Sequence, residues 1–295
     1  MNQPAQWDIA SGVGVTALMV AAARAIETHR TDRLVADPYA QAFVRAGAYP
    51  VPLPTRLDAD TDPAVPWAAM ATYLGVRSKF FDEFATSAMA GGADQVVVLA
   101  AGLDTRAFRL DFPADTTVYE LDMPRVLEFK ERVLADEGAR PRCRRRAVPV
   151  DLREDWPSAL RQAGFDPTRR TAWVAEGLLL YLLDEAKESL LSRMNDLSAA
   201  GSAIAVEHIS SAHDLTVLAQ DPLHRNMAEK TGVDLAALWA TSQDFEPEQW
   251  LADHGWAVSA SPAPALAQRC DRPLDDTTPQ PMKFSVLITA ESPSL

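Results

Sequence analysis

Acidic side chains stand at the ends of three successive apolar segments of the chain. Asp122 closes the segment "TTVYELD", Asp151 follows "AVPV", and Glu176 follows "TAWVA". If these segments are parallel strands, their carboxyl ends lie along one edge of a sheet, where folds of this kind bind ligands. Carboxylates at that edge would accept hydrogen bonds from hydroxyl and amino groups and would attract a positive charge. Each acid alone could equally be a solvated charge at a strand end.

A turn with a single glycine follows the apolar stretch that precedes Asp122. In "VVVLAAGLDTRAFRL" (residues 96–110), Gly102 would let the backbone approach a ligand, and Asp122 lies 20 residues further on. That distance is typical of a carboxylate that binds a ribose. The GxGxxG pattern that NAD and FAD need for their pyrophosphate is absent, which argues against an NAD-dependent oxidoreductase. S-adenosylmethionine fits better, because it carries ribose hydroxyls, an amino group and a sulfonium but no phosphate. We expect Asp104 and Arg106 to pair with each other or to shape the loop.

Strands and helices alternate after residue 90, which predicts a mostly parallel sheet covered on both faces. The helical patterns cover residues 13–26, 123–138 and 183–201, with Asp184 expected as an N-cap. Residues 263–282 show no helical pattern, so the last two strands could pair as an antiparallel hairpin at the sheet edge. The segments predicted to contain strands are 94–102, 116–122, 143–152, 171–182, 202–210, 256–262 and 283–290.

Composition and charge limit the partners and the compartment. The 295 residues carry a net charge of −13, which disfavours binding to nucleic acid or to an anionic membrane surface. The N-terminal residues lack the pattern of a signal peptide, and the apolar run 13–26 is too short to span a bilayer. Two cysteines without metal or redox spacing, Cys143 and Cys270, are expected to be reduced thiols in a cytoplasmic protein. Five prolines in residues 48–67 predict a surface segment without helix or strand.

Several motifs resemble the leucine carboxyl methyltransferase family, in particular its bacterial S-adenosylmethionine-dependent branch. They are "VVVLAAGLDTRAFRL", "VYELDMPRVLEFK", "PVDL" and "AEGLLLYL", preceded by "TALMVAAARAIET", "LVADPYAQAFV" and "VRSKFFDEF". The resemblance covers residues 16–208. It implies a class I methyltransferase fold: a Rossmann-like, mostly parallel seven-stranded sheet with an antiparallel C-terminal edge hairpin and an N-terminal helical lid. The lid would be residues 1–90 and the core residues 91–295, with a helical insertion at about 210–245.

The same resemblance implies how the cofactor is held. Gly102 would lie under its methionine part, and Asp122 would bind its ribose. Asp151, by its carboxylate, or Leu152, by its backbone, would hold the adenine.

Two further side chains are assigned to the methionine end of the cofactor. Glu176 would face the amino group. Arg77 would bind the carboxylate, although from the sequence alone it could equally be a surface charge. Arg24 aligns only loosely with the family and is left out.

The implied reaction is an in-line transfer of the methyl group that leaves S-adenosylhomocysteine. The resemblance favours the carboxylate of a small or medium organic acid, which is ionised at neutral pH and needs no general base. A phenol or alcohol acceptor would need one, and the weak candidates are Tyr181 and His208. The spacing of the other histidines predicts no metal site. A non-catalytic protein that binds S-adenosylmethionine is the remaining alternative.

The acceptor site is the least defined part of this interpretation. Residues 211–245 are long enough to add a helical cover over the pocket. Their apolar side chains, including Leu235, Leu238 and Trp239, would either line a hydrophobic acceptor site or pack in the core.

Overall fold

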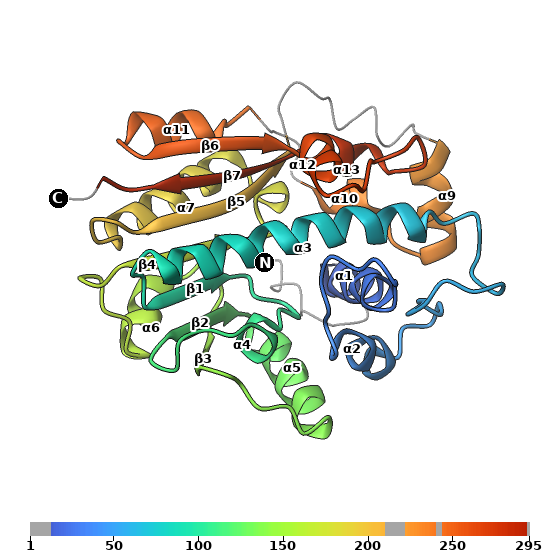
Figure 1. Ribbon diagram of the computed structural model, residues 1–295, viewed down its shortest axis with the longest axis horizontal. Coiled ribbons are helices and arrows are strands. Elements are labelled where there is room, and N and C mark those ends of the chain that lie inside the picture. The colour runs from blue at the N-terminus through green and yellow to red at the C-terminus, as the bar shows by residue number, and fades with distance from the viewer. Residues whose placement is uncertain (1–12, 210–221, 240–243, 294–295) are drawn as a thin grey trace, which may run out of the picture.

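The computed structural model describes residues 13–209, 222–239 and 244–293. Its centre is a seven-stranded sheet. The strand order is β3-β2-β1-β4-β5-β7-β6 (Figure 1). The first five strands run parallel, whereas β7 is antiparallel to both of its neighbours. The strands are β1 (Gln95–Leu99), β2 (Thr117–Asp122), β3 (Arg144–Pro149), β4 (Thr171–Ala175), β5 (Ala203–Ile209), β6 (Ala257–Pro262) and β7 (Ser285–Glu291).

The central strands are mostly apolar because both faces of the sheet are covered. All five residues of β1 are buried, with Val96 and Val98 in the core of one face and Val97 and Leu99 in that of the other. This continuous apolar run is typical of parallel strands. Its register with β2 pairs Leu99 with Leu121, so the two strands end side by side.

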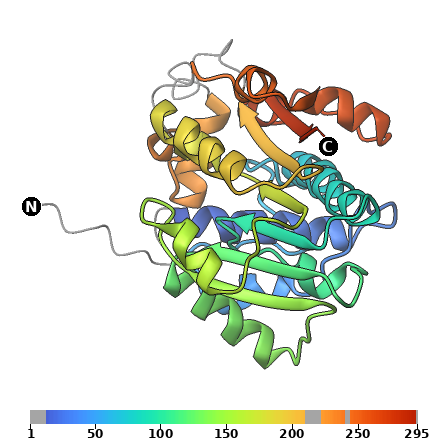
Figure 2. The ribbon, with the colours of Figure 1, turned by 90° about the vertical axis from the view of Figure 1, so that its left-hand side faces the viewer.

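Helices cover the two faces of the sheet in separate layers. Residues of α1, α3, α5 and α12 pack in the core of one face, and residues of α6, α7 and α11 in that of the other. Figure 2 shows α3 and α7 on opposite sides of the sheet. The helices are α1 (Val13–Thr28), α2 (Ala40–Gly47), α3 (Trp67–Ala90), α4 (Arg106–Arg109), α5 (Pro124–Asp136), α6 (Trp156–Gln162), α7 (Asp184–Asp196), α9 (Pro222–Thr231), α10 (Leu235–Leu238), α11 (Pro247–Asp253), α12 (Ala263–Arg269) and α13 (Gln280–Lys283), together with the 3₁₀ helix η1 (Leu179–Tyr181).

The predicted fold class is confirmed, including the antiparallel pairing of the last two strands. Two local predictions are wrong. The connection 263–282 contains α12 and α13, because the short apolar spacing of Ala263, Leu266 and Ala267 is enough to bury one helical face. Asp184 is the first residue of α7 rather than its N-cap, since its carboxylate accepts a hydrogen bond from the buried Lys187 at 2.8 Å.

Other predictions about segments can be compared directly with the structure. Of the predicted surface segment 48–67, residues 48–66 contain neither helix nor strand, and Trp67 is already the first residue of α3. Cys143 and Cys270 are both free thiols. Within the described ranges, no helix has the length and apolar character needed to cross a membrane.

Candidate functional site

A cavity of about 270 Å³ lies at the carboxyl ends of β1 and β4, where the order of the strands along the chain reverses. Ligands of open parallel sheets bind at this position. Side chains of helix α1 line the cavity together with residues at the sheet edge. Four of the predicted cofactor residues line it: Arg77, Gly102, Asp122 and Glu176.

The loop after β1 is bonded to the end of β2. The Gly102 N–H donates to Asp122 Oδ2 at 2.6 Å, and the Met123 N–H donates to Asp122 Oδ1 at 2.7 Å. Gly102 has φ 47°, a conformation that costs a residue with a Cβ about 1–2 kcal/mol. Burial raises the pKa of Asp122, and the two N–H groups oppose that rise. Each carboxylate oxygen keeps one more acceptor position, which suits a pair of ribose hydroxyls.

Glu176 joins two buried arginines at the end of β4. Its Oε1 accepts from Arg77 Nε at 2.9 Å, and its Oε2 accepts from Arg106 Nη2 at 2.7 Å. Burial alone would raise the pKa of Glu176, but the charges of Arg106 and Arg77 outweigh it and hold that pKa below its usual range. The carboxylate is therefore charged and can pair with an ammonium group. Arg106 also pairs with Asp104, as the sequence predicts.

Arg77 reaches the site from α3 and is bound on two sides. Besides Glu176, its Nη1 donates to Glu207 Oε2 at 3.1 Å. The side chain is almost fully buried, and the neighbouring carboxylates keep its pKa above the usual range in spite of the burial. In this structure the guanidinium binds the protein's own carboxylates, while it also lines the cavity.

Asp151 and Leu152 stand apart from the other predicted residues. Neither is among the described residues that line the cavity. Asp151 accepts a hydrogen bond from Arg153 Nε at 3.0 Å. Leu152 packs against the core on the face of the sheet that α6, α7 and α11 cover. Their assignment to the adenine stays a prediction.

A second cavity of about 110 Å³ adjoins the first. The two share Thr16, Val20, Arg77, Leu180 and Tyr181 in their walls. The rest of the second wall is mostly apolar, and methionines form much of it: Met19, Met70, Met227 and Met282.

Tyr73, Glu207 and Ser285 form the polar end of this second cavity. The hydroxyl groups of Tyr73 and Ser285 both donate to Glu207 Oε1, the latter at 3.0 Å. The Gly177 N–H donates to Glu207 Oε2 at 2.9 Å. Sequence reasoning missed Tyr73 and Glu207. The available signal was an acid within the buried strand β5, a placement that needs a partner.

The two weak catalytic candidates lie in different places. Tyr181 lines both cavities, with its hydroxyl 3.4 Å from Thr16 Oγ1, and burial raises its pKa. His208 lines neither cavity and instead faces Glu246 near α11. Trp239 lines the second cavity and Leu238 packs in the core, whereas the side chain of Leu235 lies outside the described part.

Comparison with known proteins agrees with this geometry. The sequence model of the family described as leucine carboxyl methyltransferase matches residues 17–195. The chain belongs to the leucine carboxyl methyltransferase family. A relative from Saccharopolyspora erythraea is 48% identical over 291 residues, which are 99% of both chains, and its name describes a candidate S-adenosyl-L-methionine-dependent methyltransferase. A similarly named relative from Mycobacterium marinum is 47% identical, covering 88% of this chain and 85% of its own.

Solved structures confirm the fold of this family member. A candidate methyltransferase from Thermobifida fusca has a TM-score of 0.50 at 19% identity, covering 92% of this chain and 94% of its own. A protein from Streptomyces avermitilis has a TM-score of 0.53 at 15% identity, covering 94% and 97%. With its family established, the chain is an S-adenosylmethionine-dependent methyltransferase, and S-adenosylmethionine is its cofactor.

Proposed function

We propose that this methyltransferase forms a methyl ester on the carboxylate of a small or medium organic acid. The observation that carries the proposal is the saturated state of Glu207. Its Oε1 accepts from Tyr73 and Ser285, and its Oε2 accepts from Gly177 and Arg77. A carboxylate has about four acceptor positions, so none is left to take a proton from an acceptor hydroxyl.

The other features of the second cavity support a carboxylate acceptor as well. Arg77 lies in the wall that the two cavities share, where a carboxylate would meet the methyl donor, although Glu176 and Glu207 already pair with its guanidinium. The mostly apolar remainder suits the carbon part of the acid, and the small volume favours a small one. Tyr181 is no general base at neutral pH, because burial raises the pKa of its phenol.

We assign the larger cavity to the cofactor. Gly102 and Asp122 would hold its ribose side, and Glu176 and Arg77 would meet its amino and carboxylate groups. We retain Asp151 and Leu152 as the adenine contacts implied by the family. The bound cofactor supplies a methyl group activated by a sulfonium.

The chain itself would act by positioning the methyl donor and the acceptor against each other and by excluding water from them. Residues of α1, α3 and η1 line both cavities and would cover the reacting atoms. We therefore treat residues 1–90 as a lid of the same domain as the core 91–295, with the insertion at about 210–245 contributing Met227 and Trp239 to the acceptor side.

The proposal is tested with methyl-labelled S-adenosylmethionine and a panel of organic acids matched to phenols and alcohols of the same carbon skeleton. We expect label in products of the acids only, and mild alkali should release it as methanol, because esters hydrolyse and ethers do not. Alkali-stable label on a phenol or alcohol would overturn the assignment in favour of ether formation. Cofactor binding without transfer to any acceptor would favour the non-catalytic alternative.

A further inference from the structure

His208 is a buried histidine whose ring nitrogens, Nδ1 and Nε2, have no hydrogen-bond partner among the described residues. Its imidazole lies on β5 and is fully buried. Buried polar groups in native proteins are nearly always paired, and leaving one unpaired is unfavourable. Such an orphaned group requires a structural explanation.

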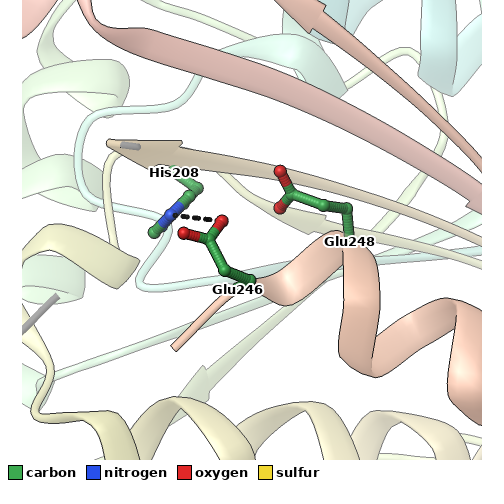
Figure 3. Close-up of side chains that lie close together, drawn as sticks. All are labelled: His208, Glu246 and Glu248. Atoms are coloured by element: carbon green, nitrogen blue, oxygen red, sulfur yellow. Dashed lines mark ion pairs between the residues drawn. The ribbon is translucent and has the colours of Figure 1, made fainter. Parts of the chain in front are cut away.

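Two carboxylates approach this imidazole from the start of α11. Figure 3 shows Glu246 and Glu248 beside His208, with Glu246 just before the helix and Glu248 in its first turn. One ligand atom from each of the three residues lies within 4.8 Å of the other two. His208 Nε2 is 3.7 Å from Glu246 Oε2, which is an ion-pair contact but too long for a hydrogen bond. Glu248 Oε2 is buried without a hydrogen-bond partner in the described ranges.

The surroundings of the three side chains favour a metal ligand set on geometry alone. The ring is buried, both of its nitrogens lack a hydrogen-bond partner among the described residues, and two carboxylates approach it. An imidazole beside two carboxylates is a donor set that binds metal ions.

We propose that His208, Glu246 and Glu248 bind one divalent transition-metal ion, and that zinc fits the site best. One imidazole nitrogen and two carboxylate oxygens suit zinc, whereas magnesium and calcium prefer oxygen ligands only. Bonds of about 2.0–2.2 Å place tetrahedral ligand atoms about 3.3 Å apart. The three side chains would thus close by at most about 1.5 Å, a movement that two glutamate side chains at a helix start can make by rotation.

The position of the site suggests a structural task. His208 precedes residues 210–245, and Glu246 follows them directly. Met227 and Trp239, which belong to this stretch, line the second cavity. An ion on His208 and Glu246 would join the two ends of the stretch and support that wall from the opposite face of the sheet, with no part in the transfer of the methyl group.

The test uses the full chain after treatment with EDTA and dialysis into a non-chelating buffer at pH 7.5. Calorimetric titration with zinc chloride should show one ion per chain with a micromolar or lower Kd, and magnesium chloride should show no binding. Glu246→Gln and Glu248→Gln keep the shape of the side chains and should each weaken zinc binding at least tenfold. The matched controls Glu188→Gln and His254→Asn change exposed residues outside the cluster and should bind zinc like the wild type.

A spectroscopic measurement identifies the ligands. X-ray absorption at the zinc edge should show nitrogen and oxygen neighbours at about 2.0 Å, with the outer-shell pattern of one imidazole. Binding of S-adenosylhomocysteine shows that each variant is folded. The test uses the two glutamate variants rather than His208→Gln, because replacing a fully buried histidine can prevent folding. The proposal is overturned if the wild type shows no saturable zinc binding, or if both glutamate variants bind zinc as tightly as the wild type.

Discussion

Removal of the Asp122 carboxylate should selectively weaken the binding of the cofactor. In Asp122→Ala the two ribose hydroxyls lose a charged acceptor, and hydrogen bonds to charged groups contribute about 1.5–3 kcal/mol each. Water can enter the space and replace part of that loss, so we expect a net cost of about 2–4 kcal/mol. This corresponds to a rise in the Kd for S-adenosylmethionine of about 30-fold to about 700-fold.

The structure also specifies how the same change affects the fold. The N–H groups of Gly102 and Met123 lose their acceptor, which should lower the free energy of unfolding by about 1–3 kcal/mol. Calorimetric titration with S-adenosylmethionine and S-adenosylhomocysteine, together with urea unfolding, separates the two effects. Asp115→Asn, an exposed carboxylate in the loop before β2, is the matched control. A folded Asp122→Ala protein with a Kd within threefold of the wild type would refute the assignment of Asp122 to the ribose.

Three further changes probe the acceptor wall and the buried charges. Trp239→Ala enlarges the second cavity and should raise the KM for the acceptor at least tenfold, measured in the methyl transfer assay, while the Kd of the cofactor stays within twofold. Asp104→Asn should flatten the dependence of stability on pH. Burial would raise the pKa of Asp104, but Arg106 holds it at about 2, below its unfolded value. The pairing therefore stabilises the fold above about pH 4, and this stabilisation is lost as the pH falls toward 2. Urea unfolding at pH 5 and pH 3 should show about 1 kcal/mol of this loss in the wild type and none of it in the variant; equal slopes would contradict it. Glu120→Gln removes the charge that pairs with the fully buried Lys130 and should cost about 3–5 kcal/mol in urea unfolding, whereas a cost below 1 kcal/mol would contradict a buried ion pair.

The sequence predicts the strand ends well because parallel pairing leaves little freedom. Once β1 and β2 are recognised as buried neighbours, their register brings Gly102 beside Asp122, and the structure has that contact. Glu176 follows for the same reason, since β4 is the other neighbour of β1. Such contacts depend on local patterns and on one topological rule.

The acceptor side could not be predicted in this way. Tyr73 and Glu207 meet because the long helix α3 crosses the end of β5, a contact between residues 134 positions apart that no local pattern encodes. Arg24 shows a different limit. The sequence shows its charge inside an apolar helix, but only the fold shows that Arg24 lines the larger cavity and donates to the Leu103 carbonyl at 2.6 Å.

Arg77 makes the two halves of the site dependent on each other. The same guanidinium is bound by Glu176, which lines the larger cavity, and by Glu207, which lines the second cavity. Under the assignment proposed above, a cofactor ammonium that pairs with Glu176 would weaken one side of this bridge and so change the charge that an acceptor meets. By thermodynamic linkage the acceptor must change the affinity for the cofactor by the same factor. Occupation of either cavity should therefore change the affinity of the other, and this reciprocal coupling sets no order of binding by itself.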